Sequence, residues 1–168
     1  MEEDSLMAQF LSFDNLLKAL EEYGIALRNE YQDNLIRSDR IASGELLNNI
    51  EFEVIQGDRA FKVNLNLASY WKYIEEGTPP HFPPVSALLK WIEVKPVLPR
   101  PFDNGKIPTP LQLAFAIRHK IGTEGTEGSP DLQNAVQKIN EEHRQKIIDA
   151  FTMDVQNTMD GYIIEFFK

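Results

Sequence analysis

Cysteine is absent from this chain of 168 residues, and its absence excludes disulfide bonds, thiolate nucleophiles and thiolate metal sites. The sequence also has no apolar run near the ~20 residues that a membrane-spanning helix needs. No basic N-terminal region precedes an apolar stretch, as it would in a secretory signal. We therefore expect a soluble protein that is made inside the cell and has no membrane partner.

Basic residues are fewer than acidic ones: the chain has 17 Lys and Arg and 26 Asp and Glu, which gives a net charge of −9. Binding to nucleic acid gains affinity from a face rich in Lys and Arg, so the composition disfavours that function. The first 34 residues hold eight acidic and two basic side chains, a net charge of −6. They predict a solvated helix face, and the alternative is a docking surface for a basic partner.

Patterns that carry catalysis or bind metal are missing as well. The three histidines, His81, His119 and His143, are too far apart in the sequence for a zinc site built on one helix. Glu75 and Glu76 suggest an acid/base pair, but adjacent helical residues point to different faces. No nucleophile elbow and no dinucleotide fingerprint occur. We expect no enzyme, no cofactor and no metal site.

The composition that remains is ordinary for a globular chain, with 42% hydrophobic and 26% charged residues. Its length suits a single domain over residues 1–168. Apolar residues at helical spacing predict a first helix from Leu6 to about Tyr31, with Gly24 as a possible bend.

Strict alternation then replaces the helical spacing. Ile50, Phe52 and Val54 alternate with glutamates, and residues 61–67 alternate in the same way. A turn signal around Gly57 separates the two runs. This pattern predicts an antiparallel hairpin with one buried face.

Residues 68–95 are the stretch around which the chain is organised. Tyr70 and Tyr73 fall on one face of a short helix that Gly77 ends. Two proline pairs stiffen the connector that follows, and a second helix begins near Pro84. The stretch predicts a helix, a rigid elbow and a helix, with aromatic side chains as core and interface anchors. A stacking platform for single-stranded nucleic acid is the other use of such side chains, and the negative charge argues against it.

Two loops flank the next helix. Residues 94–108 are rich in Pro, Asn and Gly and predict an insertion or mobile loop, with contact to a partner as the alternative. Thr109 is the N-cap of a helix that runs to Gly122. The glycine-rich, acidic residues 122–129 predict a second mobile loop, which lacks the lysine of a phosphate cradle.

The last helix starts at Ser129, with Gly161 as its C-cap. Residues 162–167 are β-prone and predict a C-terminal strand added to the hairpin, and a helical tail is the alternative. The predicted fold class is α+β: a small antiparallel sheet, the hairpin plus a possible C-terminal strand, packed against a long N-terminal helix and further helices.

Four segments, in this order, resemble the motifs of one family. Residues 43–50 resemble Gly-x-Leu-x-x-Ser-Ile, with Asn49 in place of Ser, and residues 73–81 resemble Tyr-x-Glu-x-Gly-Thr-x-x-His. Residues 84–92 resemble Pro-Pro-x-x-x-Leu-x-x-Trp-Ile, and residues 114–126 resemble Ala-x-x-Ile-x-x-Lys-Ile-x-x-x-Gly-Thr. The family is that of the tail-completion, or minor tail (head–tail connector, neck), proteins of tailed bacteriophages. The resemblance covers roughly residues 43–136, and Ser-Pro-Asp-Leu replaces the family's Pro-Phe-Phe run at 129–132.

The resemblance implies an α+β structural virion protein at the phage head–tail junction, without catalysis. It also implies a homo-oligomeric ring that contacts portal/connector or tail tube proteins, with DNA only passing through its lumen. We accordingly expect the protein in the virion after synthesis in the host cell cytoplasm. A cytoplasmic module of phage or mobile-element origin that binds or regulates one small partner is the alternative. The expected interface or structural anchors are Tyr70, Trp71, Tyr73, Glu76, Gly77, His81, Phe82 and Trp91.

Overall fold

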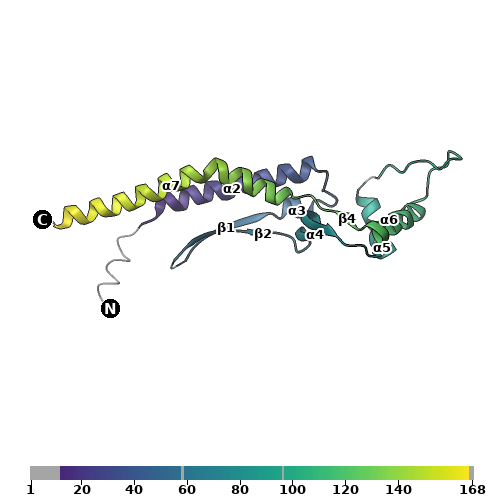
Figure 1. Ribbon diagram of the computed structural model, residues 1–168, viewed down its shortest axis with the longest axis horizontal. Helices are drawn as coiled ribbons and strands as arrows, with labels where there is room; N and C mark the ends of the chain where they lie inside the picture. Colours follow the sequence, from purple (N-terminus) through teal and green to yellow (C-terminus); the bar gives the residue numbers. More distant parts are fainter. Residues whose placement is uncertain (1–11, 58, 96, 167–168) are drawn as a thin grey trace. The chain divides into compact units, whose positions relative to one another are not determined.

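The computed structural model describes residues 12–57, 59–95 and 97–166 (Figure 1). Its two strand pairs form separate two-stranded antiparallel sheets. The predicted α+β class is confirmed, with a long N-terminal helix, a hairpin and further helices. The elements in chain order are α2 (Asp14–Arg37), α3 (Glu45–Asn48), β1 (Glu51–Gln56), β2 (Phe61–Asn66), α4 (Trp71–Glu76), β3 (Gly77–Thr78), α5 (Val85–Val94), α6 (Pro110–Glu124), β4 (Thr126–Glu127) and α7 (Asp131–Phe166).

Contacts group the chain into two compact units. Among the described residues, the first unit comprises 12–31, 51–66 and 134–166, and the second comprises 32–50 and 67–133. Each unit therefore combines segments that are far apart in the sequence, and α2 and α7 contribute to both.

In the first unit, α2 and α7 run antiparallel. Lys138 lies 2.6 Å from the Glu30 carboxylate, and Lys146 forms an ion pair with Glu22, about two turns away along each helix. The hydrogen bond from Lys146 lowers the pKa of Glu22. Apolar side chains at helical spacing fill the interior between polar faces, and those buried in this unit are Leu16, Ala19, Leu27, Tyr31, Ala135 and Ile139.

A carboxylate from α7 caps the start of α2. The buried Asp154 accepts a hydrogen bond from the Leu16 N–H at 2.8 Å and another from the Asn15 side-chain amide at 2.6 Å. The first N–H groups of a helix have no partner within the helix, and a negative charge there also favours the helix dipole. The described helix therefore begins at Asp14 and runs to Arg37, whereas the predicted residues 6–11 lie outside the described residues.

The predicted hairpin is confirmed and packs on α2. Phe52 of β1 pairs with Leu65 of β2, and the Phe52 ring occupies the space that a Cβ atom at Gly24 would need. The Arg28 guanidinium lies 5.8 Å from the centroid of the same ring. Gly24 thus serves a close approach between helix and sheet, and α2 continues through it.

The C-terminal strand is wrong, and the alternative of a helical tail is correct. α7 continues through Gly161 and ends at Phe166, so Gly161 is not a C-cap. A glycine in a helix interior costs only about 1 kcal/mol relative to alanine. The residues around Gly161 include no proline, so each peptide group keeps its bond to the preceding turn.

The second unit packs the end of α2, the short helices α3 and α4, and the α5–α6 pair. Gln32 donates a hydrogen bond to the Leu47 carbonyl at 2.9 Å, and Asn34 donates one to the Asp131 carbonyl at 2.8 Å. Both are amide side chains that satisfy backbone groups inside the unit. The apolar side chains buried in this unit are Leu35, Leu46, Ile50, Leu88 and Ala114.

The two loops expected around α6 have different outcomes. Residues 95–109 lie outside helices and strands in the described chain, and Thr109 and Gln112 form the capping box that opens α6. Residues 122–129, in contrast, contain the last turn of α6 and the strand β4. The glycines in this segment made it resemble a loop, but Gly125 and Gly128 permit backbone approaches that a sheet needs.

Candidate interaction site

Two Gly-Thr dipeptides that lie 48 residues apart in the sequence meet in the second unit. β3 and β4 pair antiparallel, with Gly77 opposite Glu127 and Thr78 opposite Thr126. The two threonine hydroxyls lie 2.9 Å apart and share a hydrogen bond. The resemblance motifs at 73–81 and 114–126 therefore form one small ladder rather than two separate features.

Glycine is required where these strands approach each other. Gly77 and Gly125 have φ values of 75° and 77°, in the region that favours glycine. A Cβ atom at Gly77 would overlap the Thr126 carbonyl oxygen, and one at Gly125 would overlap the Thr78 carbonyl oxygen. The expected anchor Gly77 is thus a structural residue at a buried backbone crossing.

Glu75 has a role that the sequence interpretation missed. Its carboxylate accepts hydrogen bonds from the backbone N–H groups of Leu132 at 2.7 Å and Gln133 at 3.4 Å, at the start of α7. Burial raises the pKa of Glu75, and the charge of Asp131 adds to this, although the backbone hydrogen bonds oppose it. The available signal was its place in the Tyr-x-Glu-x-Gly-Thr pattern, two residues before the glycine that forms the ladder.

Phe82 and His81 join the proline-rich elbow to α6. The ring of Phe82 lies where a Cβ atom of Gly122 would be, and the Arg118 guanidinium lies 5.1 Å from its centroid. The backbone N–H of His81 donates to the Ile121 carbonyl at 3.2 Å. These contacts hold the elbow against α6, while 59% of the Phe82 side chain stays exposed.

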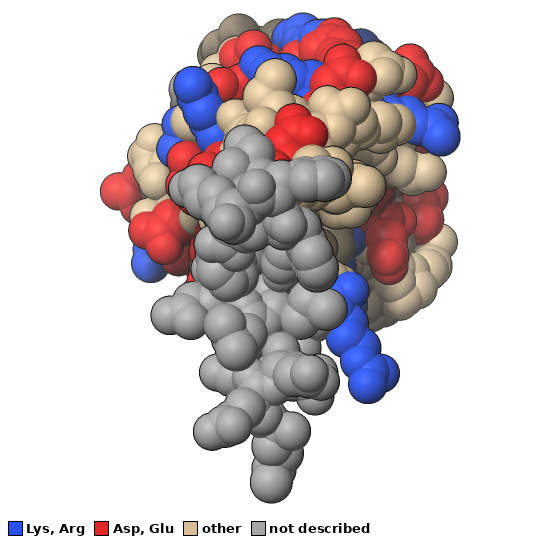
Figure 2. All heavy atoms as spheres, turned by 90° about the vertical axis from the view of Figure 1, so that its left-hand side faces the viewer, with Lys and Arg blue, Asp and Glu red and all other residues tan. Residues whose placement is uncertain are grey.

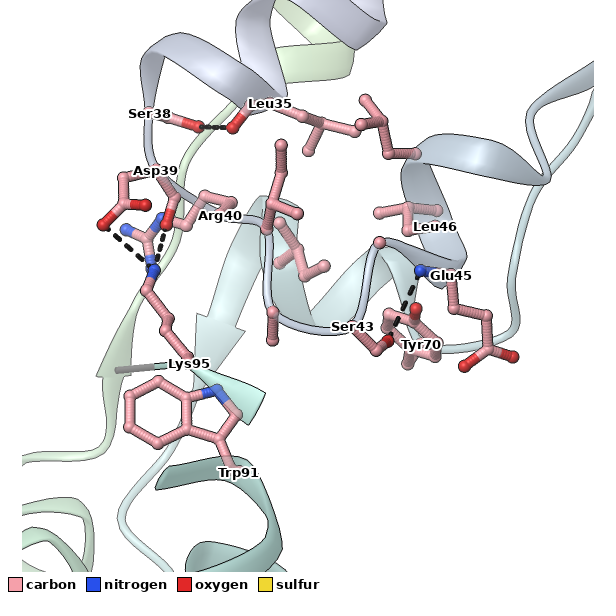
Figure 3. A pocket seen from close by; sticks show the side chains of 15 residues that line it. Leu35, Ser38, Asp39, Arg40, Ser43, Glu45, Leu46, Tyr70, Trp91 and Lys95 are labelled. Atoms are coloured by element: carbon pink, nitrogen blue, oxygen red, sulfur yellow. Dashed lines mark hydrogen bonds and ion pairs between the residues drawn. The ribbon is translucent and has the colours of Figure 1, made fainter. Parts of the chain in front are cut away.

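A cavity of about 540 Å³ lies within the second unit, between the end of α2, α3, α4 and α5 (Figure 3). Tyr70 and Trp91, two of the expected anchors, both line it. Figure 3 shows the side chain of Lys95, the residue after α5, reaching the segment that carries Asp39 and Arg40, with Trp91 of α5 beside it. The rest of the lining is mostly aliphatic and includes Leu35, Ile41, Ala42, Leu46, Leu47 and Ile74.

Several polar groups of this cavity have partners within the chain. Lys95 forms an ion pair with Asp39 at 3.0 Å and also donates to the Asp39 carbonyl. Burial, and secondarily the charge of Glu45, raises the pKa of Tyr70. The lining thus combines an apolar part with polar and charged side chains such as Ser38, Arg40 and Glu45, a mixture that suits a partner side chain or a small organic molecule with both kinds of group.

The remaining expected anchors do not gather at this cavity. Tyr73 and Glu76 are exposed on α4, and 65% of the Tyr73 side chain is accessible. Trp71 is half-buried at the first position of α4, with the Lys72 ammonium 5.8 Å from its ring centroid. The set is therefore split: Tyr70 and Trp91 at the cavity, Gly77 in the ladder, His81 and Phe82 against α6, and Tyr73 toward solvent.

The loop between α5 and α6 exposes apolar side chains that the sequence interpretation did not single out. Leu98 and Ile107 are 93% and 70% exposed. A turn closed by the Phe102 N–H to Lys106 carbonyl bond of 2.9 Å and the Gly105 N–H to Phe102 carbonyl bond of 2.8 Å forms its tip. Such exposed apolar groups are typical of a surface that binds another protein.

Within the described residues, no three His, Asp or Glu side chains lie close enough together to hold a metal ion. No helix within the same residues has the length and apolar character needed to cross a membrane.

Comparison of the chain with protein-family models, with curated proteins and with solved structures gave no match in any of the three. The likeness to phage tail-completion proteins thus depends on the four motif segments and their order.

Proposed function

We propose that this chain is a structural virion protein at the head–tail junction of a tailed phage. It acts as a neck or tail-completion protein, forms a ring of identical copies and binds portal, connector or tail tube proteins. It performs no catalysis, and DNA only passes through the lumen of the ring. Its place is the virion, after synthesis in the host cytoplasm.

The observation that carries this proposal is the pairing of the two Gly-Thr motifs. Residues quoted for the resemblance on separate segments contact each other in β3 and β4, and Glu75 of the same motif caps α7. Motif residues that interact in one structural unit support a family resemblance more strongly than isolated matches do. The exposed aromatic and aliphatic side chains of this unit suit assembly by protein–protein contact.

Deletion of the gene from a phage that carries it tests the proposal. We expect filled heads and separate tails to accumulate, and complementation in trans to restore infectious particles. Mass spectrometry of purified virions should find the protein in a fixed ratio to the portal. Intact, infectious virions from the deletion, without this protein, would contradict the proposal.

The cavity favours a second candidate, a cytoplasmic module that binds one small partner. Its aliphatic lining beside Tyr70 and Trp91 matches the chemistry of a site for an apolar group. Trp91 fluorescence gives a direct test, because a ligand in the cavity would change its emission. A partner that binds the monomer with saturation, together with absence of the protein from virions, would favour this second function.

A further inference from the structure

The C-terminal part of α7 carries an apolar stripe in acidic surroundings. With the half-buried Val155, four exposed side chains follow one another at steps of three, four, four and four residues, the spacing of a single helix face. Residues 147–166 contain four acidic side chains and no basic one. The exposed apolar residues of this stripe are Ile148, Phe151, Met159 and Ile163.

Two of those acidic residues flank the stripe on the same side. Asp149 and Asp160 are eleven residues apart, about three turns of an α-helix, and both are exposed. We call the stripe with these two carboxylates the acidic stripe. It lies in the first unit.

The loop between α5 and α6 carries a net positive charge, with Arg100 and Lys106 against Asp103. Leu98, Phe102 and Ile107 are exposed along it, and Arg100 and Lys106 are exposed between them. The wider segment 90–120 has six basic residues against two acidic ones, although the whole chain is acidic. We call residues 97–108 the basic loop. It lies in the second unit.

We propose that the basic loop of one copy docks on the acidic stripe of a second copy of this chain. The two surfaces match in both respects that matter, since each has exposed apolar side chains and the charges that border them are opposite. An interface between two different patches of identical chains is heterologous, so it repeats from copy to copy and generates a ring when the rotation closes. This inference rests on the proposed ring and assigns its contact surfaces.

Charge reversal on each surface of the full-length chain tests the proposal. The first variant, Arg100→Glu with Lys106→Glu, gives a chain in which both surfaces are acidic. The second, Asp149→Lys with Asp160→Lys, gives a chain in which both are basic. Each variant alone should associate at least about tenfold more weakly than the wild type, because like charges face each other. Light scattering and mass photometry across a concentration series measure this.

Mixing the two variants is the decisive step. In an alternating assembly every junction pairs an acidic surface with a basic one, so an equimolar mixture should recover the oligomers that neither variant forms alone. The matched controls place the same charge changes elsewhere on exposed residues: Arg59→Glu with Lys62→Glu, and Glu51→Lys with Glu142→Lys. They should assemble like the wild type.

Three outcomes would overturn the inference: a wild-type chain that stays monomeric at every concentration, variants that assemble normally, or mixtures that do not recover. A basic loop that binds within its own chain would also leave the wild type monomeric, so it counts as the first outcome. A monomer that nevertheless joins the portal or tail tube in virions would leave the proposed function standing and remove only this interface. If the protein self-assembles as expected but is absent from virions, the proposed interface would stand and the proposed function would be removed.

Discussion

At Gly125 the backbone has a φ of 77° and a ψ of −155°, a combination that residues with a Cβ atom rarely adopt. The same residue lies against the carbonyl of Thr78 across the ladder. Conformation and space therefore both demand glycine at one position. Gly105 has a nearly identical φ of 76° but no atom near its missing Cβ, so it separates the two effects.

Gly125→Ala should lower the free energy of unfolding by about 3 kcal/mol or more, because strain of about 1–3 kcal/mol adds to a backbone overlap. Gly105→Ala should cost about 1 kcal/mol from strain alone. Both tryptophans lie in the second unit, so urea unfolding followed by tryptophan fluorescence reports on that unit. Equal losses in the two variants would show that the ladder does not need the close approach.

Glu75 should give the second unit a pH dependence, and the direction of its pKa shift sets the sign. Its pKa is raised in the folded state above the ordinary value of 4.5, so the folded state binds the proton more tightly than the unfolded state. Its contribution to stability is complete below pH 4.5 and is lost as the pH rises through the folded pKa. Between about pH 4 and pH 7, the wild type should therefore lose stability relative to Glu75→Gln.

The difference in unfolding free energy between these two proteins, measured by urea titration at several pH values, checks this. Glu76→Gln is the matched control, because Glu76 is the exposed neighbour on the same helix. A difference that grows in the opposite direction would mean that the hydrogen bonds from the start of α7 outweigh burial.

At the scale of elements, a single carboxylate of α7 fixes the start of α2. Asp154→Ala should cost about 1–3 kcal/mol, since a buried acceptor for three donor groups of α2 is lost. Asp160→Ala changes the same residue type at an exposed position of the same helix and should change stability by less than about 0.5 kcal/mol. Thermal unfolding followed by far-UV circular dichroism compares them. Similar midpoints would contradict the capping role.

The continuous end of α7 leads to a prediction of opposite sign. Gly161 lies within the helix with open space around its missing Cβ, so Gly161→Ala should stabilise this end by about 0.5–1 kcal/mol. Amide exchange of residues 155–166 should slow, and helicity should rise slightly. Faster exchange would favour the strand, with Gly161 as the C-cap of a shorter helix.

At the scale of the whole molecule, charge is unevenly divided. The segments of the first unit hold 16 acidic and 8 basic residues, a net charge of −8, whereas the second unit has −1 of the total of −9. Figure 2 shows the molecule from the side of its C-terminus, with Asp and Glu side chains interspersed with Lys and Arg. Mixed charge of this kind keeps a surface solvated, so association depends on where apolar groups are exposed.

The exposure of each expected anchor indicates whether it stabilises the fold or is available for contact with another protein. Tyr73→Ala should change stability by less than about 0.5 kcal/mol, because the side chain is largely in solvent, while Trp71→Ala should cost about 2 kcal/mol or more. In the proposed phage role, Tyr73→Ala should reduce the yield of infectious particles from a folded protein. Complementation of the deletion, with unfolding curves of both variants, measures this. Full complementation by Tyr73→Ala would remove it from the interface.

The sequence by itself predicted the features whose physical cause is local. Alternation at Phe52 and Val54 defined the hairpin, Thr109 and Pro110 defined the start of α6, and Gly77 defined the end of α4. In each case neighbouring residues along the chain supply the hydrogen bonds or the buried face. The resemblance and the absence of cysteine were equally available without a structure.

Only the tertiary structure decided how distant segments meet. The sequence predicted a loop at Gly125 and Gly128, because it does not show that Thr78 and Glu75 lie opposite them. The β-prone end of the chain was predicted to be a strand, although a helix satisfies the hydrogen bonds of its backbone groups without a distant partner. Glu75 and Asp154 cap helices that begin far away in the sequence. Such contacts depend on the path of the whole chain, which no local pattern contains.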